Sequence, residues 1–196
     1  MGRAFFGFTV CLIGLVLAPA ARACGPEVVI RFIDSAPDIF IIENKSQEPW
    51  TLLTLEFRTK TSAGHVVFDT DFGGAGASEP QQFEPVEGEV GLMAAPVVAD
   101  GAEELSLSFA NFERGREFTF SIDLDDRLPM SDMGQAYVTG EEIQGTTVLG
   151  LLTHPQIGEA KARGTFGADG KAVFVGGYGR LHAVVEDVSR ALRKEA

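Results

Sequence analysis

Apolar residues recur at every second position in a series of short runs, and turn-forming residues separate the runs. The segment Trp50–Thr59 shows the pattern, since Leu53, Leu55 and Phe57 would share one face of a strand. Comparable runs lie at 27–33, 39–43, 65–70, 105–109, 118–122, 136–139, 146–152, 158–166 and 171–175. Strand-length runs at such short intervals predict an all-β protein.

The runs follow one another without a linker, so we expect a single β-sandwich, immunoglobulin-like or jelly-roll-like, over residues 24–178. The dipeptide Asp169-Gly170 lies between two of the runs and predicts a β-hairpin. After residue 178 the apolar period becomes helical, with Leu181, Val188 and Leu192 on one side. We therefore expect a short C-terminal amphipathic helix over 179–196, which would cap the edge of the sandwich. A helix for a partner or a membrane is the alternative.

The first 23 residues have the form of a cleaved secretory signal peptide. Arg3 gives a positive start, the run Ala4–Leu17 is apolar and uncharged, and Ala21-Arg22-Ala23 is a small-x-small cleavage motif. The apolar run is too short to span a bilayer as a helix, although a retained membrane anchor is the alternative reading. No later segment is apolar and long enough to cross a membrane, so we expect a secreted or periplasmic protein.

Cleavage after Ala23 would leave Cys24 as the first residue of the mature chain. A bacterial lipoprotein carries its lipid at this position, so a lipid tether at Cys24 is one expectation. A lone terminal thiol is the other, because Ala21 and Arg22 match the lipoprotein motif poorly. Cys11 leaves with the signal peptide, so the mature chain has no cysteine pair for a disulfide.

The chain is strongly acidic, with a formal net charge of −12. Removal of the signal peptide takes away Arg3 and Arg22 and no acidic residue, which brings the formal charge to −14. Such a charge repels nucleic acid and anionic lipid, and it suits cation binding. We therefore expect no nucleic-acid partner.

The acidic residues gather most closely in Asp123-Leu124-Asp125-Asp126, at the end of an expected strand. Asp69 and Asp71 share the same alternation at the end of another expected strand. Calcium takes six to eight oxygen ligands and favours such clusters. If the two strand ends are neighbours, these five aspartates predict a calcium site. A solvated acidic strand end is the alternative.

Signals for catalysis are sparse. The chain has no Gly-x-Ser-x-Gly motif, and the three histidines (His65, His154 and His182) show no spacing typical of a zinc site. The glycines Gly73, Gly74 and Gly76 lack the Lys-Ser/Thr that follows a phosphate-binding loop, and they indicate a long flexible loop instead.

Two longer stretches carry a family resemblance. One runs from Phe68-Asp69-Thr70 through Gly73-Gly74-Ala75-Gly76 to Gln82-Phe83-Glu84-Pro85-Val86. The other runs from Phe118 through Asp126 and continues in Val138-Thr139-Gly140-Glu141-Glu142-Ile143-Gln144-Gly145-Thr146-Thr147-Val148. Together they resemble bacterial proteins labelled as similar to the sponge aggregation factor core protein. The resemblance implies an extracellular β-rich module associated with adhesion, which in the sponge is calcium-dependent and glycan-linked. It supplies no catalytic residues.

We therefore expect an exported, non-enzymatic binding or adhesion module, stabilised by calcium, whose partner is a surface glycan or a protein. A structural or matrix-type protein without a small ligand is the first alternative. A periplasmic hydrolase that uses the carboxylates around Asp123 is the second. The scarcity of Trp and Tyr, with only Trp50, Tyr137 and Tyr178, argues against an aromatic-rich substrate groove.

Overall fold

The computed structural model describes residues 25–77, 79–86, 88–131 and 135–175. Strands make up 45% of this part and helices 5%, and the strands pair antiparallel, which confirms the all-β class. The expected signal peptide, Cys24 and the expected helix over 179–196 lie outside the described residues.

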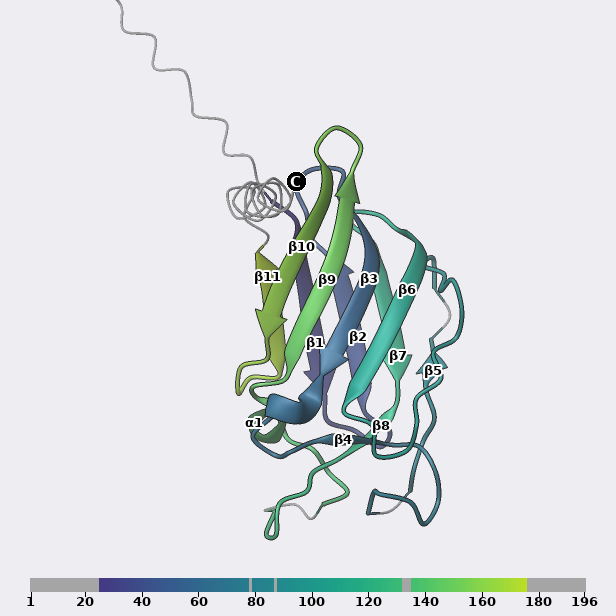
Figure 1. The fold of residues 1–196 in the computed structure, drawn as a ribbon, viewed down its shortest axis with the longest axis vertical. Helices are drawn as coiled ribbons and strands as arrows, with labels where there is room; N and C mark the ends of the chain where they lie inside the picture. Colours follow the sequence, from purple (N-terminus) through teal and green to yellow (C-terminus); the bar gives the residue numbers. More distant parts are fainter. Residues whose placement is uncertain (1–24, 78, 87, 132–134, 176–196) are drawn as a thin grey trace, which may run out of the picture.

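The strands form two larger sheets and one small one (Figure 1). The first sheet has the order β11 (Lys171–Val175), β1 (Glu27–Ile33), β2 (Ile39–Asn44), β7 (Glu117–Ser121) and β5 (Glu84–Pro85). The second has the order β10 (Gly158–Thr165), β9 (Thr147–His154), β3 (Thr51–Arg58) and β6 (Glu104–Phe112). The small sheet pairs β4 (Val67–Asp69) with β8 (Asp123–Asp125). Two short helices complete the described elements, η1 (Thr59–Thr61) and α1 (Gly140–Ile143).

The two larger sheets face each other in a sandwich-like arrangement and share one hydrophobic core (Figure 1). Phe40 of β2 stacks on Phe120 of β7 at 4.9 Å between ring centroids. The same Phe40 meets Phe57 of β3 edge-on at 5.3 Å, which joins the first sheet to the second. Such aromatic pairs add to the burial of their apolar surface.

Alternation decides which side chains enter this core, with one exception in β3. Leu55 and Phe57 are buried as expected, but Leu52 is buried in place of Leu53. The pairing register of β3 shifts between Leu52 and Thr54, as at a β-bulge. A bulge inserts one residue and therefore reverses the face on which the preceding residues lie.

The turn at Asp169-Gly170 does not close the expected hairpin. β10 pairs with β9, and β11 pairs with β1, so the turn carries the chain from one sheet to the other. The carbonyl of Gly170 accepts a hydrogen bond from the Phe32 amide, which ties the turn to the end of β1. A dipeptide that favours a tight turn fixes the local chain reversal, and it does not fix which strands pair.

The expected strand over 136–139 is also absent. Thr139 instead caps α1 in a capping box, in which its side chain accepts from the Glu142 amide and the Glu142 carboxylate accepts from the Thr139 amide. The pattern Thr-x-x-Glu at 139–142 is the sequence signature of this helix start.

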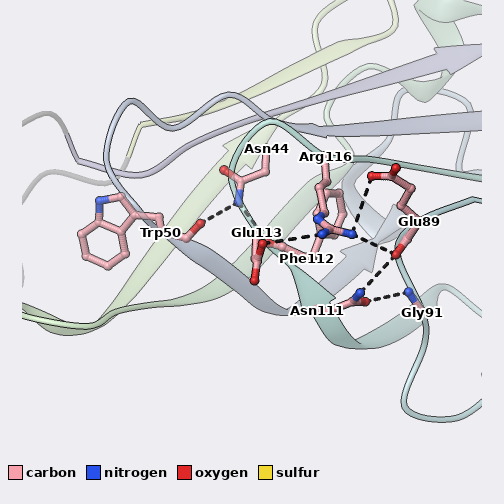
Figure 2. Close-up of polar contacts among 8 residues, drawn as sticks. All are labelled: Asn44, Trp50, Glu89, Gly91, Asn111, Phe112, Glu113 and Arg116. Atoms are coloured by element: carbon pink, nitrogen blue, oxygen red, sulfur yellow. Dashed lines mark hydrogen bonds and ion pairs between the residues drawn. The ribbon is translucent and has the colours of Figure 1, made fainter.

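The ends of the strands are braced by polar contacts on the side where β2 ends (Figure 2). The buried Asn44 side chain donates to the Trp50 carbonyl at 2.9 Å and to the Phe112 carbonyl at 3.1 Å. It thereby joins the end of β2 in the first sheet to the residue before β3 and to the end of β6 in the second. Nearby, Asn111 and Arg116 bind the loop around Glu89, in a more exposed setting. At the opposite end of the strands lies the small β4–β8 sheet (Figure 1).

Candidate metal centre

The pairing of β4 with β8 brings together aspartates that are more than fifty residues apart in the sequence. Asp69 lies directly opposite Asp123, and Val67 lies opposite Asp125. Phe68 and Leu124 alternate with these aspartates and belong to the hydrophobic core. Since alternation places successive side chains on opposite faces, the three carboxylates share the other face of the small sheet. The two strand ends are thus neighbours.

Three aspartates form the candidate site, which we call the aspartate cluster: Asp69, Asp123 and Asp125. Each offers a carboxylate oxygen, and these oxygens lie within 4.8 Å of one another. The three residues are buried, with 2%, 7% and 1% of their surface exposed. Each also has one buried side-chain oxygen without a hydrogen-bond partner. Buried polar atoms normally have a hydrogen-bond partner, and a bound cation would give these three oxygens the partner that they lack.

The protonation of the cluster reflects this environment. Burial raises the pKa of Asp69 to about 7, and hydrogen bonding with Asp100 and the charge of Asp125 add to the shift. Burial likewise raises the pKa of Asp123 to about 7, reinforced by the charges of Asp125 and Asp69. Burial also raises the pKa of Asp125, partly offset by the hydrogen bond from the Ala77 amide. Without a cation the site therefore resists full ionisation near neutral pH.

The glycine-rich loop after β4 closes over the cluster. The Ala77 amide donates to a carboxylate oxygen of Asp125. A Cβ atom on Gly76 would overlap the carboxyl groups of Asp69 and Asp125, so position 76 admits only glycine in this geometry. The backbone of the loop thus packs directly against the carboxyl groups, at a distance that a side chain at position 76 would prevent.

Asp100 holds this loop in place. Its carboxylate accepts hydrogen bonds from the amides of Thr70 (3.0 Å), Asp71 and Ala75. These bonds, led by the one from Ala75, lower the pKa of Asp100. A carboxylate that accepts several backbone bonds stays ionised, which makes Asp100 a stable anchor for residues 70–75.

Asp38 supports the cluster from the side of β8. Its carboxylate accepts from the Leu124 amide at 3.2 Å, and its carbonyl accepts from the Ile122 amide at 3.1 Å. Burial raises the pKa of Asp38 to about 9, with a further contribution from the charge of Asp123. The side chain is therefore a neutral acid at pH 7, and it fixes the backbone that carries Asp123 and Asp125.

Two of the five aspartates expected at the site lie outside the cluster. Asp71 is exposed; its backbone amide donates to Asp100, and its carbonyl accepts from the Gly74 amide. Asp126 is buried: one of its carboxylate oxygens accepts from the Leu128 amide at 2.7 Å, and the other has no hydrogen-bond partner. Its carboxylate is nevertheless not among those whose oxygens lie within 4.8 Å of one another.

Three contributors to the site were not foreseen: Gly76, Asp38 and Asp100. Asp38 and Asp100 each lie in a turn far along the chain from the other aspartates, and turn residues of this kind give no sign of such a role. The signal for Gly76 was the glycine-rich run directly after Asp69.

The histidines that the structure describes do not join the cluster. His65 precedes β4, with a φ of 52°. His154 is buried at the end of β9, where its ring lies 5.0 Å from that of Trp50. His182 lies outside the described residues. The candidate site is therefore made of carboxylates, a donor set for hard cations rather than for zinc.

Comparisons with known proteins do not identify this arrangement. No family model, curated protein or solved structure gives a significant match to the chain. In the part of the chain that the structure describes, no helix is long and apolar enough to cross a membrane.

Proposed function

We propose that this protein is an exported, non-enzymatic binding module, a single β-sandwich whose aspartate cluster holds a calcium ion at one end. The observation that carries the proposal is the burial of three neighbouring carboxylates, each with an oxygen that lacks a hydrogen-bond partner. Like charges opposite each other in a sheet are destabilising, and a divalent cation reverses that cost.

Calcium is the ion that this donor set favours. It accepts six to eight oxygen ligands in flexible geometry, and carboxylates bind it through one oxygen or two. Magnesium requires a stricter octahedron and retains several waters. The Ala77 amide and the Gly76 backbone pack closely against the cluster, which favours direct carboxylate ligands over a hydrated ion.

A calcium ion here would tie three parts of the chain together: β4, β8 and the glycine-rich loop between Thr70 and Ala77. Loops that a metal orders on a rigid scaffold are common sites of recognition. This supports a role in adhesion or binding, toward a surface glycan or a protein, in the secreted or periplasmic location that the signal sequence favours.

Thermal unfolding with and without calcium tests the proposal. A ligand that binds only the folded state stabilises it by about 2.7 kcal/mol at a hundredfold excess over its dissociation constant. For a domain of this size, about 2–4 °C per kcal/mol is typical, so calcium should raise the melting temperature by several degrees over an EGTA-treated sample. Asp125→Asn should abolish the increase.

The controls separate binding from folding. An asparagine at 125 retains an oxygen that can accept from the Ala77 amide, so Asp125→Asn should fold and melt in EGTA no lower than the wild type. Asp71→Asn changes a neighbouring exposed aspartate outside the cluster and should retain the calcium response. A wild-type melting curve that millimolar calcium leaves unmoved would contradict the calcium site and favour a structural protein without a small ligand.

A further inference from the structure

A cavity of about 330 Å³ adjoins the aspartate cluster, and Asp123 belongs to both. Its wall is built from the turn before β2, the loop between β4 and β5, and the chain before α1. A cavity of this size lies within the range of small-ligand sites, which is about 300–1,000 Å³. A ligand in the cavity would therefore sit beside any cation held by the cluster.

The remaining wall residues offer both flat apolar surfaces and polar groups. Phe72 and Tyr137 line the cavity, and 82% and 46% of their respective surfaces are exposed. Aromatic rings exposed beside a cavity provide faces on which the C–H surface of a ligand can stack. Ser35 and Gln81 belong to the same wall. The Ser35 hydroxyl donates to the Pro37 carbonyl and the Gln81 amide nitrogen donates to the Ser121 hydroxyl, which leaves their side-chain oxygens as acceptors for a ligand.

The acidic charge of the cavity wall limits which class of ligand the cavity can bind. Asp123 and Glu79 are acidic, and the described residues that line the cavity include no Lys or Arg. Three carboxylates around a divalent cation still leave a negative charge, so a carboxylate or phosphate ligand would be repelled. A neutral ligand with several hydroxyl groups avoids this repulsion and supplies the oxygen atoms that calcium accepts.

The coordination of calcium leaves room for such a ligand. Three carboxylates supply between three and six oxygens, depending on how many bind through both, whereas calcium takes six to eight. Asp123 belongs both to the cluster and to the wall of the cavity, so a ligand in the cavity would approach the ion from the side of Asp123.

We propose that this cavity binds a neutral polyhydroxylated ligand, a saccharide unit with adjacent hydroxyl groups, which completes the coordination of a calcium ion held by the aspartate cluster. The inference rests on the proposed calcium site. Phe72 and Tyr137 stack on the ring of the saccharide, and Asp123 links the saccharide subsite to the metal.

Isothermal titration calorimetry of the full mature chain tests this inference, with neutral monosaccharides (mannose, fucose, galactose and N-acetylglucosamine) titrated in calcium and in EGTA. We expect at least one of them to bind in calcium and none to bind in EGTA. Phe72→Ala and Tyr137→Ala should each weaken that binding about tenfold, while the affinity for calcium alone changes by less than about twofold. Met93→Ala, which removes an exposed apolar side chain outside the cavity, should leave both affinities unchanged.

The outcomes distinguish the two proposals. If calcium binds and none of the sugars does, the saccharide subsite is wrong and the calcium site stands. If calcium does not bind, the calcium site itself is wrong. Sugar binding that persists in EGTA, or that neither aromatic substitution weakens, would overturn the shared site. Binding of a primary amine such as methylamine in place of the sugars, or release of nitrophenol from a nitrophenyl glycoside, would also overturn it.

Discussion

At the scale of single residues, the aspartate cluster depends on the absence of a side chain at Gly76 as much as on its three carboxylates. Gly76 has no side chain, and a Cβ at this position would overlap the carboxyl groups of Asp69 and Asp125. The Ala77 amide then reaches Asp125 from the same loop. One glycine therefore decides whether the loop can close over the aspartates.

Replacement of Gly76 by alanine should weaken calcium binding more than it weakens folding. The new methyl group would push the carboxylates apart, and we expect the calcium affinity to fall about tenfold or more, as measured by calorimetry. Gly88→Ala is the matched control, since a Cβ there meets no atom closer than 3.9 Å. Calcium binding by the Gly76→Ala variant at wild-type affinity would contradict a cation held between carboxylates that pack against this loop.

At the scale of elements, the two larger sheets are joined by polar contacts as well as by the core. Asn44, the last residue of β2, is the main link. Its buried side-chain amide nitrogen donates hydrogen bonds to the carbonyls of Trp50 and Phe112 (Figure 2). Its side-chain oxygen also accepts from the Ser46 amide at 3.3 Å. Each of these backbone groups would lose its partner if the side chain were truncated.

Asn44→Ala should therefore lower the free energy of unfolding by about 2–4 kcal/mol, since each buried group left unsatisfied costs about 1–3 kcal/mol. Urea denaturation measures the change. Asn111→Ala also removes two hydrogen bonds to backbone groups, at Gly91 and Glu89, but both are exposed to water. We expect a loss of less than about 1 kcal/mol for this control. Equal losses for the two variants would rule out Asn44 as a special link between the sheets.

At the scale of the whole molecule, the buried aspartates connect stability to pH and to calcium. The pKa of Asp69 and of Asp123 is about 7 in the folded protein, against about 3.9 in an unfolded chain. Between about pH 4 and about pH 7, these two aspartates are therefore protonated in the folded state and ionised in the unfolded state. The contribution of these two groups to stability without calcium is therefore greatest below about pH 4, and it falls as the pH rises to about 7.

Urea denaturation in EGTA at pH 4.5, 6.0 and 7.5 checks this prediction, and the same series in calcium should show a smaller fall. Protons and calcium compete for the same oxygens, so the apparent calcium affinity should weaken as the pH drops below about 7. Asp125→Asn removes one charge from the cluster and should flatten the series in EGTA. A stability in EGTA that rises steadily from pH 4.5 to 7.5 would contradict the raised pKa values of the cluster.

Much of the fold follows from local sequence alone. Alternation in runs such as 117–121 and 104–112 determines which side chains enter the core, because successive residues of a strand face opposite ways. The same rule places Asp123 and Asp125 on one face of β8. Local sequence also starts α1 through Thr139 and Glu142, although the alternation at 136–139 pointed to a strand instead.

Only the tertiary structure decided which strands pair and which residues make up the site. Asp69 and Asp123 meet because β4 and β8 pair, and nothing local in either strand specifies that partner. The turn at Asp169-Gly170 joins two sheets for the same reason, since turn residues set a chain reversal without choosing the neighbour that the next strand will pair with. Asp38, Gly76 and Asp100 support the cluster from outside it, through packing and backbone hydrogen bonds to parts of the chain distant in sequence. The sequence alone thus determined the faces of the strands, apart from the bulge at the start of β3, whereas the tertiary structure decided which faces meet. The reason is that burial of the shared core selects among all pairings that the alternation permits.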